Sequence, residues 1–282
     1  MKAWITLLTD PAYLAGVRTL HQSLQDTHTR YPLVVMVTAG IGQQIRDDLA
    51  AEGCDVRAVT PLRPRDGVAG GYAYARFAEV WSKLCAWRLT GFSRLVLLDA
   101  DMLALKNMDE LFDIPLPAGG IAACHACRCN PNHIATYPKS WVPANCYYTY
   151  SANPAALPAD FTPYFNSGII VLTPGEKTYD ELAGQVAAIT DLAAYPFPEQ
   201  DLLNAYFQGR WLALPYGYNA LKTLSVHHAA MWRMPQVKNL HFILDKPWQY
   251  APDQPDARHD PYYPLIERWW MTYRRLAPNS RW

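Results

Sequence analysis

Residues 95–107 read LVLLDADMLALKN, an apolar run that ends in two acids. The run at 95–98 is typical of a strand buried in a parallel sheet. Asp99 and Asp101 follow it at once, separated only by the small residue Ala100. Because open α/β sheets bind ligands beyond the carboxyl ends of their strands, the two carboxylates are predicted to face a ligand.

The segments before this stretch predict further strands and helices. Short apolar segments occupy residues 3–8, 33–37 and 55–59. Apolar residues recur at helical spacing between these segments and before the acidic motif. The stripes are Leu14, Val17, Leu20 and Leu24, then Ile41, Ile45 and Leu49, then Phe77, Trp81, Leu84 and Trp87. This alternation predicts an α/β fold with a mostly parallel central sheet that carries helices on its faces.

The second half of the chain begins with an irregular segment. Residues 124–165 are rich in Cys, Pro, Asn and Tyr and have no sustained period, which predicts a long surface loop. Regular patterns then predict a strand at 168–172, helices at 179–189 and 199–207, and a late strand at 237–243.

The composition excludes several classes of protein. Twenty-five basic and 25 acidic residues cancel without long charge runs, which argues against a nucleic-acid partner. No apolar run approaches the ~20 residues of a membrane span, and the N-terminal one is too short for a signal peptide. Six cysteines in 282 residues lack the density of a disulfide scaffold. The sequence therefore predicts a cytoplasmic protein that binds a small molecule or another protein.

Two acids at a strand end have several interpretations. Carboxylates one residue apart can hold a hard divalent cation that also binds phosphate oxygens, as in a nucleotide diphosphate complex. They can equally cap a loop, because so short a motif has many false matches. Aspartyl-phosphate phosphatases also place D-x-D after a strand, but there it usually follows the first strand, whereas three strand–helix units precede it here.

Eight segments in order resemble glycosyltransferase family 8, the retaining enzymes that include glycogenin and galactinol synthase. They are TLLTDPAY, YPLVVMV, WSKLCAW, LLDADMLALKNMDELFD, YFNSGIIVLTP, PFPEQDLLNAYF, LPYGYNAL and HFILDKPW, which together span residues 6–248. The resemblance implies a GT-A fold, a single Rossmann-like α/β/α domain at 1–250. A C-terminal extension at 251–282 is expected to pack on the same domain.

The resemblance also implies a metal and a donor site. Asp99, Asp101 and His241 would bind Mn²⁺ or Mg²⁺, with His241 supplied from a distant strand. The donor, UDP-galactose or UDP-glucose, would contact Leu7, Thr9, Asp10, Tyr13, Lys83, Asp99, Ala100, Asp101, His241 and Lys246. In place of the family's HxxGxxKPW, this chain has Leu244 at the glycine position and one residue fewer before Lys246.

By the same resemblance, the reacting sugar would lie near Asn166, Glu199, Gln200 and Lys83. Glu199 and Gln200 are interpreted as groups that orient the sugar or stabilise an ion pair. A nucleophilic role for Glu199 is not inferred, because retention in this family is often explained by attack on the face from which the diphosphate leaves.

The acceptor is predicted to be a separate molecule. In glycogenin the acceptor tyrosine lies eight residues beyond the tyrosine of the YN motif, and here that count from Tyr218 reaches Val226. The prediction is a galactinol synthase-like enzyme that acts on a polyol, an oligosaccharide or a glycoprotein glycan. A glycogenin-like self-glucosyltransferase and a non-catalytic nucleotide-sugar-binding scaffold remain open as alternative functions. A homodimer is a possible oligomeric state.

The cysteine group in the long loop leaves three interpretations open. Cys124, Cys127, Cys129 and Cys146 lie close in sequence, with His125 and His133 among them. A C-x-x-C pair can supply two thiolates to structural zinc. Free thiols that shape the loop, or a disulfide, are the alternatives.

Overall fold

The computed structural model describes residues 1–72, 78–250 and 258–276. Its centre is a seven-stranded sheet in the order β3-β2-β1-β4-β7-β6-β8. In that order the strands are Asp55–Ala58, Leu33–Val37, Lys2–Leu8, Arg94–Leu98, Phe165–Leu172, Ile121–His125 and Trp211–Leu214. Pairing is parallel except at β7, which runs antiparallel to both β4 and β6.

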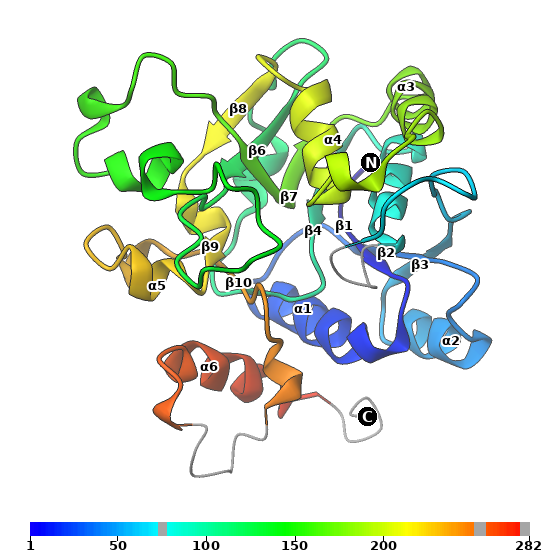
Figure 1. Ribbon diagram of the computed structural model, residues 1–282. Helices are drawn as coiled ribbons and strands as arrows, with labels where there is room; N and C mark the ends of the chain where they lie inside the picture. The colour runs from blue at the N-terminus through cyan, green and yellow to red at the C-terminus, as the bar shows by residue number, and fades with distance from the viewer. Residues whose placement is uncertain (73–77, 251–257, 277–282) are drawn as a thin grey trace.

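Helices cover both faces of this sheet (Figure 1). On one face lie α1, Leu14–Asp26, and α2, Gln43–Ala51. On the other lie α3, Glu176–Ala187, and α4, Pro198–Tyr206. The predicted α/β/α architecture with a mostly parallel sheet is therefore confirmed.

One predicted helix differs in type. Residues Val80–Arg88 form a 3-10 helix, which buries Trp81, Leu84 and Trp87 against the second face of the sheet. Its predicted first residue, Phe77, lies outside the described residues. A 3-10 helix repeats every three residues, so side chains at 81, 84 and 87 share one face as they would in an α-helix.

A second, three-stranded sheet extends the fold beside α1 and α5, Leu224–His227. It has the order β5-β10-β9, with strands Met102–Ala104, Asn239–His241 and Ala220–Leu221. The predicted late strand at 237–243 thus belongs to this small sheet and not to the central one. Because β4 and β5 flank the acidic motif, residues 99–101 connect the two sheets.

The C-terminal helix α6, Tyr263–Tyr273, packs on the small sheet and on α1. Ile266 and Trp269 are buried there beside Ala15, Leu103 and Leu240. Among the residues that the structure describes, no helix is both long and apolar enough to cross a membrane.

Candidate active site

A cavity of about 690 Å³ opens at the carboxyl ends of β1, β2 and β4. The acidic motif lies on its wall, together with the start of α4 and the loop after β10. This is the edge at which a doubly wound sheet binds ligands.

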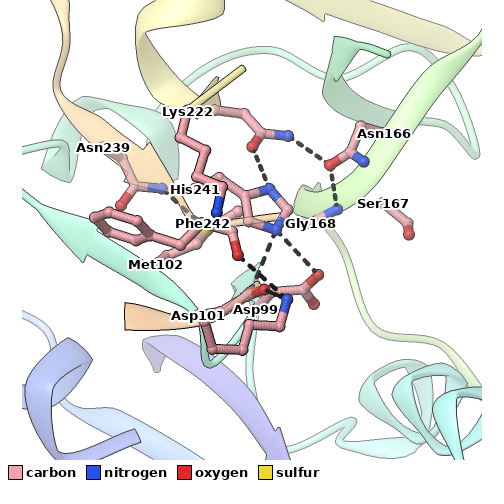
Figure 2. A network of polar contacts seen from close by, with 12 residues as sticks. Asp99, Asp101, Met102, Asn166, Ser167, Gly168, Lys222, Asn239, His241 and Phe242 are labelled. Atoms are coloured by element: carbon pink, nitrogen blue, oxygen red, sulfur yellow. Dashed lines mark hydrogen bonds and ion pairs between the residues drawn. The ribbon is translucent and has the colours of Figure 1, made fainter. Parts of the chain in front are cut away.

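Three predicted metal ligands converge at the end of β4. His241 Nε2 lies 3.2 Å from Asp101 Oδ1 and 3.7 Å from Asp99 Oδ2. Figure 2 shows the imidazole ring directed at both carboxylates. His241 reaches the motif because β10 pairs with β5, which sets His241 opposite Met102. The Phe242 amide also donates to the Asp101 carbonyl at 2.9 Å.

The His241 ring is oriented by a buried amide. Asn219 Oδ1 lies 2.8 Å from His241 Nδ1, and Asn219 Nδ2 donates to Asn166 Oδ1 at 2.8 Å. Because Asn219 Oδ1 is an acceptor, this network assigns the ring proton to Nδ1. The Nε2 lone pair then faces the carboxylates, so the three side chains fit a divalent cation with two oxygen ligands and one nitrogen ligand.

Gly168 makes room for this arrangement. A Cβ atom at position 168 would lie 2.4 Å from His241 Cε1 and 2.8 Å from Asn166 Oδ1. The Gly168 amide donates to Asn166 Oδ1 at 3.0 Å. Any side chain here would displace the imidazole, so the glycine of YFNSG is a steric requirement of the site.

The buried Lys246 ammonium group neutralises the negative charge of Asp101. Its ammonium group forms an ion pair with Asp101 Oδ2 and donates to the Phe242 carbonyl at 3.2 Å. Burial alone would raise the pKa of Asp101, but the Lys246 ammonium group outweighs this effect and holds that pKa well below its usual range. Asp101 is therefore a carboxylate throughout the neutral range.

The short loop before Lys246 does not prevent this contact. Leu244, at the family's glycine position, has a φ of 65°, in the left-handed region that favours glycine. The Lys222 ammonium donates to the Asp245 carbonyl at 2.8 Å and anchors the loop from the side of β9. The loop thus keeps the glycine-like backbone conformation although the glycine is replaced.

Lys83 links the acidic motif to α4. Its ammonium lies 2.6 Å from Asp99 Oδ1 and 2.9 Å from Glu199 Oε1. Burial alone would lower the pKa of Lys83, but the Asp99 and Glu199 carboxylates raise it well above its usual value. Glu199 also accepts from the Ser167 hydroxyl at 3.0 Å, so its carboxylate is held in a fixed orientation.

Gln200 and Asn166 belong to one hydrogen-bonded chain. Gln200 Oε1 accepts from Asn166 Nδ2 and from the Ser167 amide, each at 3.0 Å. Gln200 Nε2 donates to the Tyr164 hydroxyl at 3.1 Å, which donates to Asp201 Oδ1 at 2.6 Å. Burial raises the pKa of Asp201 to about 6, although the hydrogen bond from Tyr164 opposes this rise.

The predicted nucleoside-binding residues line the same cavity: Leu7, Thr9, Asp10 and Tyr13, together with Ala100 of the acidic motif. Asp10 also has a capping role, because its Oδ1 accepts from the Ala12 amide at 2.9 Å. The Tyr13 ring packs edge-on against Trp248 with 5.4 Å between ring centroids.

The structure therefore brings every predicted site residue to one cavity or its immediate wall. Sequence reasoning missed Asn219, Ser167, Gly168 and Tyr164, which orient the predicted residues. They lie in the segments YFNSG and YGYN, but one sequence does not reveal that β7, α4 and β9 place these polar groups side by side.

Comparison with known proteins agrees with this geometry. The model of the family Glycosyl transferase family 8 matches residues 4–251. Galactinol synthase 7 of Arabidopsis thaliana is 30% identical over 280 residues, which cover 96% of this chain and 81% of the relative. Galactinol synthase 2 of Solanum lycopersicum is 29% identical over 280 residues, with 96% and 80% covered.

Solved structures share the fold. The galactosyltransferase LgtC, solved with donor and acceptor sugar analogs, superposes with a TM-score of 0.64 at 18% identity, covering 99% of this chain and 98% of LgtC. The glycosyltransferase GlyE of Streptococcus pneumoniae gives 0.58 at 16% identity, with 97% and 61% covered.

The fold and the site define a glycosyltransferase of the GT-A type. The chain belongs to glycosyl transferase family 8. The predicted enzyme class, a UDP-sugar-dependent glycosyltransferase, is confirmed.

Proposed function

We propose that the protein is a metal-dependent, retaining hexosyltransferase of the galactinol synthase type. It moves galactose or glucose from a UDP-sugar to a hydroxyl of a small polyol or glycan. The observation that carries this proposal is the convergence of Asp99, Asp101 and His241 on the cavity at the sheet edge. The similarity to galactinol synthases over 96% of the chain supports the choice of acceptor class.

Asp99, Asp101 and His241 would hold the metal, Mn²⁺ or Mg²⁺. When bound, a divalent ion supplies positive charge to the diphosphate of the donor. Lys83 and Lys246 add two cations at the same edge of the cavity. Their ammonium groups stabilise the negative charge that the diphosphate gains as it leaves the sugar.

Glu199, Gln200 and Asn166 orient the sugar in this proposal. Glu199 is paired with Lys83 and accepts from Ser167, so its oxygen is engaged in fixed contacts. Gln200 and Asn166 are held by each other at 3.0 Å. These contacts favour an orienting role over a nucleophilic one, and retention then follows from attack on the face from which the diphosphate leaves.

Aromatic side chains support an acceptor with a ring. Tyr137, Trp141 and Phe197 line the cavity beside α4. Trp141 stacks on Phe197 with 4.4 Å between centroids, and Tyr137 meets Phe197 edge-on at 4.8 Å. Rigid aromatic faces beside polar groups suit the C–H faces of a cyclitol or a pyranose.

The proposal also covers the division of the chain into domains and its cellular location. Residues 1–250 form the transferase domain, and 251–282 form an extension whose helix α6 packs against α1. The protein works in the cytoplasm, where its six cysteines, none of which forms a disulfide, would stay reduced.

The proposal is tested with Asp101→Asn, which keeps the size of the side chain but removes a charged ligand. UDP release from UDP-galactose and UDP-glucose is measured with and without Mn²⁺. We expect the wild type to require the metal and the variant to lose about 10²-fold in rate. Asp47→Asn, an exposed change on α2, serves as the matched control and should keep the wild-type rate.

Unchanged turnover of Asp101→Asn at limiting Mn²⁺ would reject the metal assignment. Binding of UDP-sugar without turnover in the wild type would instead favour the scaffold alternative.

A further inference from the structure

A second cluster of metal-ligand side chains lies beside the cavity. Cys127 and Cys129 follow β6, Cys146 precedes the 3-10 helix Tyr147–Tyr150, and His228 follows α5. Their ligand atoms all lie within 4.8 Å of one another. None of these four side chains takes part in the metal site formed by Asp99, Asp101 and His241.

The distances are those of a tetrahedral site. His228 Nε2 lies 3.4 Å from Cys127 Sγ, 3.3 Å from Cys129 Sγ and 3.9 Å from Cys146 Sγ. The Cys127 and Cys146 sulfurs are 3.9 Å apart. Zinc–sulfur bonds of about 2.3 Å and zinc–nitrogen bonds of about 2.0 Å place tetrahedral ligand atoms roughly 3.5–3.8 Å apart. The four distances therefore lie within a few tenths of an ångström of those in a tetrahedral zinc site.

The members differ from those that the sequence grouped together. Cys124 is buried and donates to the Pro215 carbonyl at 3.3 Å. His125 stacks on Tyr147 with 3.7 Å between centroids, and His133 is not among the clustered residues. His228, which lies 82 residues beyond Cys146 in the sequence, is the fourth member of the cluster. The sequence missed it because the α5 segment approaches the loop only in the folded chain.

We infer that Cys127, Cys129, Cys146 and His228 bind one structural Zn²⁺ ion. Three soft thiolates and one imidazole select zinc over the hard cations that suit the carboxylate site. Four protein ligands close the coordination shell, which is typical of structural and not catalytic zinc. A Cys127–Cys146 disulfide would not explain why Cys129 and His228 lie in the same cluster.

The site would fasten one wall of the cavity. Cys127, Leu221 and Ile243 line the cavity or lie beside it, and all three pack with Cys146 in one apolar cluster. Zinc would therefore tie the loop after β6 to the end of α5, next to the apolar cluster that contains Leu221 and Ile243. This zinc site stands independently of the proposed transferase reaction, because none of its ligands belongs to the reacting centre.

The first test is metal content. Protein purified without metal-affinity resin or chelator is analysed by inductively coupled plasma mass spectrometry. We expect about one zinc per chain in the wild type, and well under half of that in Cys129→Ser and His228→Ala. Cys85→Ser is the matched control, because Cys85 is a buried cysteine outside the cluster that donates to the Thr60 carbonyl. Asp101→Asn separates the two metal sites, and both controls should keep the zinc.

The second test uses wild-type protein, so it does not depend on a variant that folds. Replacement of the bound metal by Co²⁺ should give the intense visible bands and the thiolate charge-transfer absorption of a tetrahedral cobalt site. Zinc-free wild type in which Cys127, Cys129 and Cys146 all react with a thiol reagent would overturn the inference. Loss of two hydrogen masses from protein made in a reducing host, which indicates a disulfide, would also overturn it.

Discussion

His241 acquires its role from neighbours that are remote in sequence. Asn219 Oδ1 lies 2.8 Å from His241 Nδ1 and fixes the tautomer of the imidazole, and Gly168 leaves space for the ring. Asp99 and Asp101 could be predicted from the sequence because they lie one residue apart and follow a strand. Asn219 could not, because its partnership with His241 arises from the pairing of β9 with β10.

Asn219→Ala tests this orientation. Loss of the Nδ1 acceptor should weaken metal binding about 10- to 100-fold, as is typical for an outer partner of a ligating histidine. The measurement is the Mn²⁺ concentration at half-maximal UDP release. At saturating metal, we expect a smaller change in the KM for the donor. Asn107→Ala removes an amide that donates to the Thr27 carbonyl and does not line the cavity, so it should leave the Mn²⁺ dependence unchanged. An unaltered Mn²⁺ midpoint in Asn219→Ala would contradict the assigned role.

Asp201 makes a pH-dependent contribution to stability. Its pKa is about 6 in the folded protein, above its ordinary value of 3.8, because burial disfavours the charged carboxylate and Glu199 repels it. The folded state then binds more protons than the unfolded state between about pH 4 and 6. Stability from this group is complete below about pH 4 and is lost as the pH rises through 6.

Asp201→Asn removes that titration. The free energy of unfolding of the wild type, relative to the variant, should fall by about 2 kcal/mol between pH 4 and 7. Denaturant titrations of both proteins at pH 4, 5, 6 and 7 measure this difference. A constant difference across that range would show that Asp201 titrates normally.

At the scale of elements, the pairing of β5 with β10 builds the site. It brings His241 to the acidic motif and starts the loop that returns Lys246 to Asp101. The sequence predicted the late strand but not its sheet, because a three-residue strand carries no signal of its partner. It likewise predicted a helix around Trp81, while the 3-10 form could not be distinguished from an α-helix.

Leu244 tests the loop after β10. Its φ of 65° strains any residue with a side chain, and Ala at this position keeps that strain. Leu244→Gly should therefore be more stable than Leu244→Ala by about 1 kcal/mol, the reverse of the order in an exposed helix. Thermal or denaturant unfolding of the two variants measures the order. A more stable Ala variant would show that the loop does not adopt this conformation.

At the scale of the whole molecule, the α/β/α architecture could be predicted because strand and helix patterns alternate before residue 99. The antiparallel direction of β7 could not be predicted, since a strand buried on both faces has the same apolar pattern in either direction. The cavity could be located from the sequence at the carboxyl edge of the sheet. Its aromatic wall could not, because residues 126–141 have no periodic pattern.

The separate-acceptor proposal predicts that the protein does not glycosylate itself. Val226 is 41% exposed on α5 and has no nucleophilic oxygen. Protein incubated alone with UDP-glucose or UDP-galactose and Mn²⁺ should keep its mass in intact-protein mass spectrometry. A ladder of hexose increments would favour the glycogenin-like alternative.

The most direct measurement is the product formed from UDP-galactose and myo-inositol in the presence of Mn²⁺. The proposed function predicts a galactosyl-inositol, identified by mass, in an amount equal to the UDP released. Nuclear magnetic resonance should find the sugar in the same anomeric configuration as in the donor. A product of inverted configuration, or bound UDP-sugar without transfer to any polyol or glycan tested, would contradict it.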